Sequence, residues 1–183
     1  HHTDRRQRQM CIRDRGFSSV MRSVVLPTLT PLLLENPDIK LTFLVREMEE
    51  LPGMFLRGEI DLMILHHVWE RQGVESESIG IERNALTECK NYDGPEIFID
   101  HDENDQITSK YLKMKRSRAK YERRFLDDVY GLIDGVKLGL GRAVLPIHLV
   151  KPEKSLRIVD KESILEIPVV LHYHDQPYYS ELQ

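Results

Sequence analysis

Six polar residues stand together at positions 100–105, in the order DHDEND, and form a dense group of possible ligand atoms. Oxygen-bearing side chains at the first, third and fifth positions are typical of a calcium-binding loop. Such a loop also needs glycine at its sixth position and a bidentate glutamate at its twelfth, where this chain has Asp105 and Tyr111. The pattern therefore argues against calcium. It favours a helix start, with Asp102 or Glu103 near the positive end of the helix dipole.

Histidines are the candidates for a transition-metal site, and the ones considered are His66, His67, His101, His172 and His174. Residues 172 and 174 fall on one face of a predicted strand. Two in-line histidines do not form a metal site without a third ligand. We therefore predict no bound metal.

Motifs of the common enzyme families are missing from the sequence. It contains no GxSxG, HExxH, CxxC or Walker loop, so no catalytic residue is assigned and no cofactor is predicted. The stretch GLGRAV at 139–144 approaches GxGxxG, but Val144 stands at the last glycine position. These glycines are instead expected to let a helix turn tightly into a strand. Cys89 is expected to pack in the interior.

Charge and hydropathy limit the function further. The 183 residues carry a net charge of −4; the first 15, with five arginines and two aspartates, contribute +3, which leaves −7 for the rest. A body of that charge is a poor free-standing binder of nucleic acid. No apolar run approaches 18 residues, so we expect no membrane span, and one cysteine outside the first 15 residues fits a reducing cytoplasm. The expected partner is a small molecule or another protein.

The element that organises the candidate residues is a helix over residues 18–35. Its apolar side chains recur at intervals of three and four, and Ser18 or Ser19 stands where an N-cap is expected. Pro27 lies inside this pattern and predicts a bend, because proline has no N–H to donate.

The other predicted elements alternate between strand and helix, which indicates an α/β fold with a parallel sheet. Asp127 or Asp128 is expected to cap the helix predicted to end at Val136. The strands are expected over 39–45, 61–65, 74–89, 96–100, a segment closing at 125–126, 143–146 and 165–174, and the helices over 48–57, 102–115 and 128–136.

A run of basic residues lies within positions 110–124, and its members are Lys110, Lys113, Lys115, Arg116, Arg118, Lys120, Arg123 and Arg124. A solvated helix end would explain it, because cations are favoured near the negative end of the helix dipole. The alternative is a contact with an anion or with the DNA backbone.

Three blocks of the sequence together resemble the effector-binding domain of LysR-type transcriptional regulators. The blocks are VLPTLTPLLLENPDIKLTF at 25–43, EELPGMFLRGEIDLMIL at 49–65 and VKLGLGRAVLP at 136–146. Their order and spacing fit the family, and the resemblance covers roughly residues 17–183. It implies an α/β fold of the two-lobed, periplasmic-binding-protein type 2-like kind, built from two Rossmann-like subdomains.

The resemblance implies a division into lobe I, at 16–85 and 150–183, and lobe II, at 86–149. Residues 1–15 are instead expected to be artefactual and disordered, because their portion RRQRQMCIRDR at 5–15 resembles the in-frame translation of a transposon adapter used in sequencing libraries. The family's winged helix-turn-helix would then be absent. The first strand of the effector domain would be missing as well, unless the adapter segment occupied its place.

Ligands of open α/β sheets bind beyond the carboxyl ends of the strands, and the resemblance places an effector between the lobes, at a serine or threonine that starts the first helix. A helix N-terminus with Arg46 close by favours a small organic anion. The alternatives are that Arg46 pairs with neighbouring glutamates and that Ser18 only caps the helix. The expected effector-binding residues are Ser18, Ser19, Arg46, Glu47, Met48, His66, His101 and Asp102.

The resemblance implies the ligand-sensing part of a cytoplasmic transcription factor. The intact protein would form a homodimer or homotetramer, with the first helix as a dimer surface, and bind promoter DNA through its N-terminal domain. One alternative is a solute-binding receptor of a transport system with the same fold. Another is an enzyme whose turnover depends on Asp100, His101 or Asp102.

Overall fold

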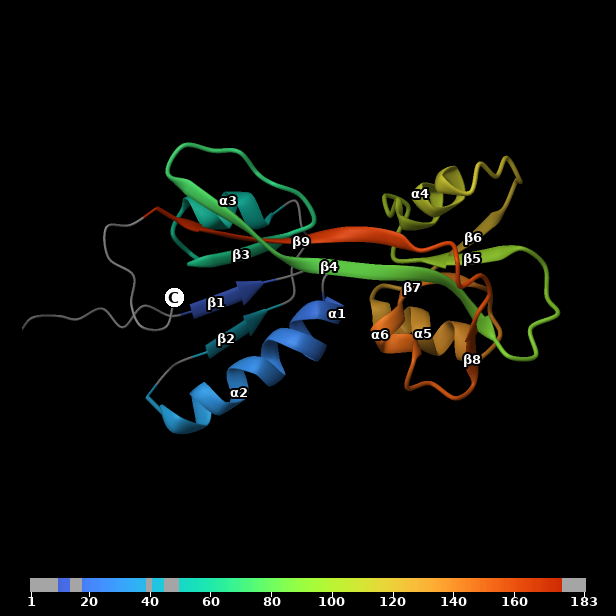
Figure 1. Ribbon diagram of the computed structural model, residues 1–183, viewed down its shortest axis with the longest axis horizontal. Coiled ribbons are helices and arrows are strands. Elements are labelled where there is room, and N and C mark those ends of the chain that lie inside the picture. The colour runs from blue at the N-terminus through green and yellow to red at the C-terminus, as the bar shows by residue number, and fades with distance from the viewer. Residues whose placement is uncertain (1–9, 14–17, 39–40, 45–49, 176–183) are drawn as a thin grey trace, which may run out of the picture. The chain divides into compact units, whose positions relative to one another are not determined.

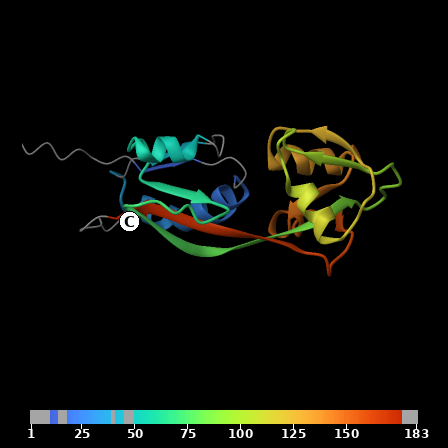
Figure 2. The same ribbon diagram turned by 90° about the horizontal axis from the view of Figure 1, so that it is seen from above.

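The computed structural model describes residues 10–13, 18–38, 41–44 and 50–175. The chain divides into two compact units, unit 1 with residues 1–80 and 168–183 and unit 2 with residues 81–167. It leaves unit 1 in β4 (Val74–Cys89) and returns to it in β9 (Leu165–His174), the long green and red strands of Figure 1 and Figure 2. Residues 150–167 thus group with unit 2, whereas we expected them in lobe I. The reason is that β8 (Leu156–Ile158) pairs with β4.

The first helix of unit 1 runs from residue 18 to residue 35, as the apolar spacing predicted. It comprises α1 (Ser18–Val20), the π-helical turn η1 (Met21–Val25) and α2 (Leu26–Glu35). The N–H of Leu26 donates to the carbonyl of Met21, five residues earlier, so the wider register comes just before Pro27. A π-turn at this point suits proline, because proline supplies no N–H to the regular ladder.

The strand β1 (Met10–Arg13) pairs in parallel with β2 (Leu41–Leu44) and lies beside β3 (Leu62–Leu65). Residues 10–13 therefore belong to the sheet, and the expectation that the whole N-terminal segment is disordered is wrong for them. The physical reason is that a parallel partner satisfies the backbone groups along the edge of β2. Of the two possibilities left open by the sequence, this is the one in which residues of the N-terminal segment form a strand beside β2.

The helix α3 (Leu51–Leu56) supplies the core of unit 1. Gly58 follows it with a φ of 68°, the left-handed conformation expected of a glycine at a helix end. The strand β3 pairs antiparallel with β9, from Leu62 opposite Tyr173 to Leu65 opposite Val170. The buried residues of this core are Leu51, Met54, Phe55, Ile60, Met63 and Leu65.

Unit 2 is a sheet with helices on both faces. The strand β5 (Ile97–Asp100) pairs in parallel with β6 (Glu122–Phe125), and its Phe98 forms an isolated bridge to Arg142. The strand β7 (Ala143–Pro146) follows at once and pairs antiparallel with β4. Both β5 and β7 are buried throughout, which is typical of strands covered on two faces.

Alternating side chains of β5 and β7 pack into two separate hydrophobic cores. Ile99 packs with α5 (Val129–Lys137) and α6 (Ile147–Val150), whereas Phe98 packs with Tyr111 of α4 (Ile107–Met114). Successive residues of a strand point to opposite faces, so α4 covers one face and α5 and α6 the other. This three-layer arrangement fixes where the loops after β5 and β6 emerge.

The glycines between α5 and β7 make the tight turn that the sequence predicted. Gly139 has a φ of 75°, a conformation that glycine adopts without strain. At Gly141 a Cβ would lie 2.7 Å from the carbonyl oxygen of Ile97, so only glycine lets the chain approach β5 this closely.

Candidate functional site

The carboxyl ends of β5 and β6 emerge side by side in unit 2. His101 follows β5, and its Nδ1 lies 3.3 Å from the carbonyl oxygen of Asp127, which follows β6. This edge of a parallel sheet is where ligands of α/β proteins bind, because the connecting loops diverge there. The predicted site residues His101 and Asp102 both lie in this loop.

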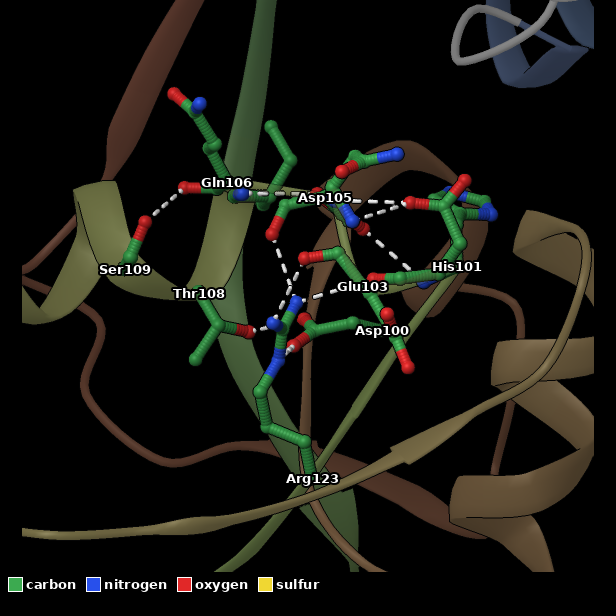
Figure 3. Close-up of polar contacts among 11 residues, drawn as sticks. Asp100, His101, Glu103, Asp105, Gln106, Thr108, Ser109 and Arg123 are labelled. Atoms are coloured by element: carbon green, nitrogen blue, oxygen red, sulfur yellow. Dashed lines mark hydrogen bonds and ion pairs between the residues drawn. The ribbon is translucent and has the colours of Figure 1, made fainter.

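A buried ion pair between Asp100 and Arg123 lies at the start of the loop that follows β5. Asp100, with a side chain only 2% exposed, accepts hydrogen bonds from the Oγ1 of Thr108 at 2.5 Å and from the Nε of Arg123 at 2.6 Å (Figure 3). Arg123 comes from β6 and Thr108 from α4, so one carboxylate joins three elements of unit 2.

The guanidinium of Arg123 also fixes the backbone of the loop. Its Nη1 donates to the carbonyl of Glu103 at 3.1 Å, and its Nη2 donates to the carbonyls of Asp102 at 3.1 Å and Asp105 at 2.8 Å (Figure 3). One side chain thus donates hydrogen bonds to three carbonyl groups that accept none within a helix or a sheet. The loop is held in one conformation by this residue.

The helix after the loop begins later than predicted. Residues 102–106 form turns, and α4 begins at Ile107, whose N–H donates to the Oδ1 of Asp105 at 2.9 Å. Asp102 instead accepts from the N–H groups of Asn104 and Asp105 within the loop. The expectation that Asp102 or Glu103 caps this helix is wrong, because Asp102 is used two and three residues ahead in a local turn.

Burial raises the pKa of Asp100, since removing a carboxylate from water disfavours its charged form. The hydrogen bonds from Thr108 and Arg123 oppose this effect, and the neighbouring Asp105 adds to it. The pairing therefore offsets part of the desolvation cost of Asp100 but not all of it.

The N-terminus of α5 is closed by its own cap. Asp128 accepts from the N–H groups of Tyr130 at 2.7 Å and Gly131 at 2.8 Å, which decides between the two caps that the sequence allowed. These donors are thus occupied, and the carboxylate of Asp128 repels a further anion. Together with Asp102, Glu103 and Asp127, it makes this edge of unit 2 acidic.

A group of histidines lies around the carboxyl end of β3 in unit 1. The rings of His66 and His67 are 4.7 Å apart, and the Nε2 of His172 in β9 accepts from the N–H of Trp69 at 3.0 Å. His174 contacts other groups, stacking on Phe55 at 4.0 Å. No three ligands that could hold a metal ion come together among the residues described.

Burial lowers the pKa of His172, whose side chain is fully inaccessible to water, and His67 lowers it further. The backbones of Met63 and Val170 act in the opposite direction. Because Nε2 accepts from Trp69, the proton of the neutral ring is on Nδ1, and among the described residues no acceptor with good hydrogen-bond geometry faces that atom.

The remaining predicted site residues belong to unit 1 or lie outside the described residues. Ser18 is the first residue of α1, and Ser19 follows it with a side chain only 1% exposed. Arg46, Glu47 and Met48 lie outside the residues that the structure describes. His66 comes directly after β3.

Sequence reasoning missed Arg123 as a site-forming residue and treated it as one cation of a basic run. The signal that could have found it is the strand pattern of β6. Arg123 and Arg124 are adjacent in that strand and therefore point to opposite faces, so only one of them can face the acidic loop after β5.

The elements described form a two-unit α/β domain, and its fold is similar to that of solved regulatory domains of LysR-family proteins. No protein-family model matches the sequence, and no curated protein matches it either. Within the described residues, no helix has the length and apolar character to cross a membrane.

Solved structures provide the similarity. The C-terminal domains of a LysR family protein from Agrobacterium tumefaciens match with a TM-score of 0.78 and 14% identity, covering 91% of this chain and 87% of that one. The apo regulatory domain of HypT from Salmonella typhimurium matches with a TM-score of 0.78 and 14% identity, covering 100% and 93%.

Full-length LysG from Corynebacterium glutamicum, solved with its bound effector Arg, matches with a TM-score of 0.74 and 13% identity, covering 93% of this chain and 63% of that one. The chain thus spans under two thirds of this full-length regulator. These comparisons confirm the predicted fold class and the resemblance to LysR effector-binding domains.

Proposed function

We propose that this chain is the ligand-sensing part of a LysR-type transcription regulator, and that it binds a small effector between its two units. The observation that carries the proposal is the fold, which aligns over nine tenths of the chain with a LysR C-terminal domain. In the intact protein, homodimers or homotetramers would bind promoter DNA through a separate N-terminal domain. An effector would act by binding two assembly states with different affinities.

The residues proposed to contact the effector come from the strand and helix ends of both units. Ser18 starts the first helix, where N–H groups and the dipole attract a carboxylate, and His101 and Asp102 follow β5. The edge of unit 2 is acidic and its α5 donors are capped, which disfavours a second negative group there. The effector class is therefore a small carboxylate, and amino acids are the first compounds to test because LysG, with the same fold, has Arg as its effector.

Serine substitutions in the intact gene test the placement. Ser18→Ala combined with Ser19→Ala should weaken binding of the active carboxylate between about 5-fold and about 150-fold in calorimetry, because a charge-assisted hydrogen bond contributes about 1–3 kcal/mol. Thr28→Ala is the matched control, since Thr28 is exposed on the same helix and its hydroxyl donates to the carbonyl of Val24, the one partner described for it. Equal affinities of the double variant and the control would reject the proposed contact.

The solute-receptor alternative predicts a secretory signal upstream of the domain in the intact gene, where the regulator predicts a helix-turn-helix. The enzyme alternative has no support from the contacts described. Asp100 is buried in an ion pair, and Asp102 is engaged in a turn, so neither is placed as a reactive group.

A further inference from the structure

The segment from α4 to β6 displays a basic surface that the contacts of unit 2 leave unused. Of its eight basic residues, three are engaged: Lys115 donates to Asp160 at 2.5 Å, Arg123 holds Asp100, and Arg124 donates to the carbonyl of Leu140 at 2.5 Å. The other five are exposed, and their side chains have no ion pair or hydrogen bond within the described part of the chain. They form what we call the basic segment: Lys110, Lys113, Arg116, Arg118 and Lys120.

The backbone at Arg116 is unusual for an arginine. The N–H of Arg116 donates to the carbonyl of Lys113 and the N–H of Ser117 to that of Leu112, which is the hydrogen-bond pattern of a Schellman motif. Arg116 occupies the left-handed position of that motif with a φ of 54°, where glycine is the usual residue. A side chain there reduces stability, and no described contact of the guanidinium compensates for it. The contacts of the described residues do not explain why arginine stands at this position.

The basic segment lies away from the candidate effector edge. It ends at the amino end of β6, whereas His101 and Asp102 follow the carboxyl end of the parallel strand β5. The helix α4 starts near the effector edge and carries the chain back to the opposite edge, as its path in Figure 1 shows. Effector binding therefore gives no account of these five charges.

We propose that the basic segment contacts the phosphate backbone of duplex DNA, in addition to the DNA-binding domain that the proposed function requires. Lysine and arginine both bind phosphate oxygens, and such contacts supply affinity without reading sequence. The inference rests on the proposed function for its biological setting only.

Charge and composition favour DNA over an acidic protein as the partner. The chain after residue 15 carries a net charge of −7, but five unpaired cations lie within eleven of its residues. Salt screens the repulsion between DNA and the more distant negative charges, so these cations can still attract phosphate groups. Protein interfaces are depleted in lysine and need an apolar centre. The one large apolar side chain that is strongly exposed among these residues is Met114, at 42%, which is too little for such a centre.

The test measures binding of the purified 183-residue chain to a short fluorescent duplex of random sequence, by anisotropy across a salt titration. The variant K113Q/R116Q/R118Q removes three charges from the basic segment. The control K90Q/K151Q/K154Q removes three charges from lysines elsewhere in unit 2, whose side chains have no described partner. The arginines of the first 15 residues are common to all three proteins, so differences among the proteins report on the basic segment.

The basic-segment variant should bind at least about tenfold more weakly at the lowest salt, and its dependence of log K on log salt should flatten by about 0.9 for each phosphate that is no longer neutralised. The control should stay within about twofold of the parent chain, and far-UV circular dichroism should be unchanged in both. Equal salt slopes in the two variants would overturn the proposal, as would a parent chain that does not bind the duplex. Preferential binding to poly-L-glutamate would overturn it in favour of a protein partner. Because no effector enters this assay, the regulator proposal can fail in the serine experiment while this one stands.

Discussion

Replacing Arg123 with methionine is the most informative perturbation of unit 2. The change keeps an unbranched side chain but leaves the carboxylate of Asp100, 2% exposed, without its cation, and removes the guanidinium donors from three loop carbonyls. Breaking one partner of a buried ion pair typically costs about 3–5 kcal/mol, chiefly because the other charge stays buried. The side chain of Arg123 is 26% exposed, so water screens part of the interaction, and we expect the lower end of that range.

The assay is urea unfolding of unit 2, followed by far-UV circular dichroism and by hydrogen exchange of peptides from residues 97–125. Fluorescence of Trp69, the only tryptophan, reports on unit 1 and serves as an internal reference. Arg124→Met is the matched control, because Arg124 is exposed and the carbonyl of Leu140 is the one partner described for its side chain. Loss of this exposed hydrogen bond should lower the free energy of unfolding by less than about 1 kcal/mol. Equal destabilisation by the two substitutions would refute the structural role of Arg123.

A double substitution and a change of pH sharpen the test. Adding D100N to R123M should restore stability, because the buried carboxylate that lost its cation is then replaced by a neutral amide. We expect a coupling energy of about 1–3 kcal/mol between the two positions. The folded-state pKa of Asp100 is raised, so its protonated form favours folding at low pH and this contribution is lost as pH rises through that pKa. The stability difference between the parent and R123M should therefore shrink as pH falls through the pKa of Asp100.

Two further predictions concern stability at single positions. Arg116→Gly should stabilise unit 2 by about 1 kcal/mol, because glycine adopts the left-handed φ of 54° without a Cβ clash, whereas Arg116→Ala, which keeps the Cβ, should give no gain; thermal unfolding of both variants measures this. His172 has a lowered folded-state pKa, so its contribution to stability is complete above its unfolded pKa near 6.5 and is lost as pH falls through the folded pKa, by at most about 1.4 kcal/mol per pH unit. His172→Gln should flatten this loss in urea titrations repeated across that pH range, and a slope unchanged from the parent would contradict the assignment.

Sequence patterns predicted the elements well where burial decides them. The run Leu-Met-Ile-Leu of β3 indicates a strand covered on both faces, and three of its four residues are buried. The first helix was predicted over its full length, but the π-turn before Pro27 was not, because apolar spacing does not specify which carbonyl a donor selects.

The candidate site was harder to predict because it depends on contacts between distant residues. The sequence marks residues 100–105 as polar. The start of the helix depends on whether an aspartate side chain accepts from N–H groups within a local turn or from the first N–H groups of the helix, and aspartate forms both arrangements. Arg123 decides between them by occupying the carbonyls of the loop, from 18 to 21 residues away. No spacing rule within the loop contains that information.

The contacts of Arg123 also bear on how unit 2 would bind a ligand. A loop that must order itself on binding loses part of its interaction energy to conformational entropy, whereas a loop already fixed does not. The ion pair with Asp100 and the three carbonyl contacts fix residues 101–105 before any ligand arrives. A group that binds there would then act on β5, β6 and α4 together, because Asp100 and Arg123 join all three. The donors of α5 are already taken by Asp128, whose carboxylate disfavours a further negative group at this edge of unit 2.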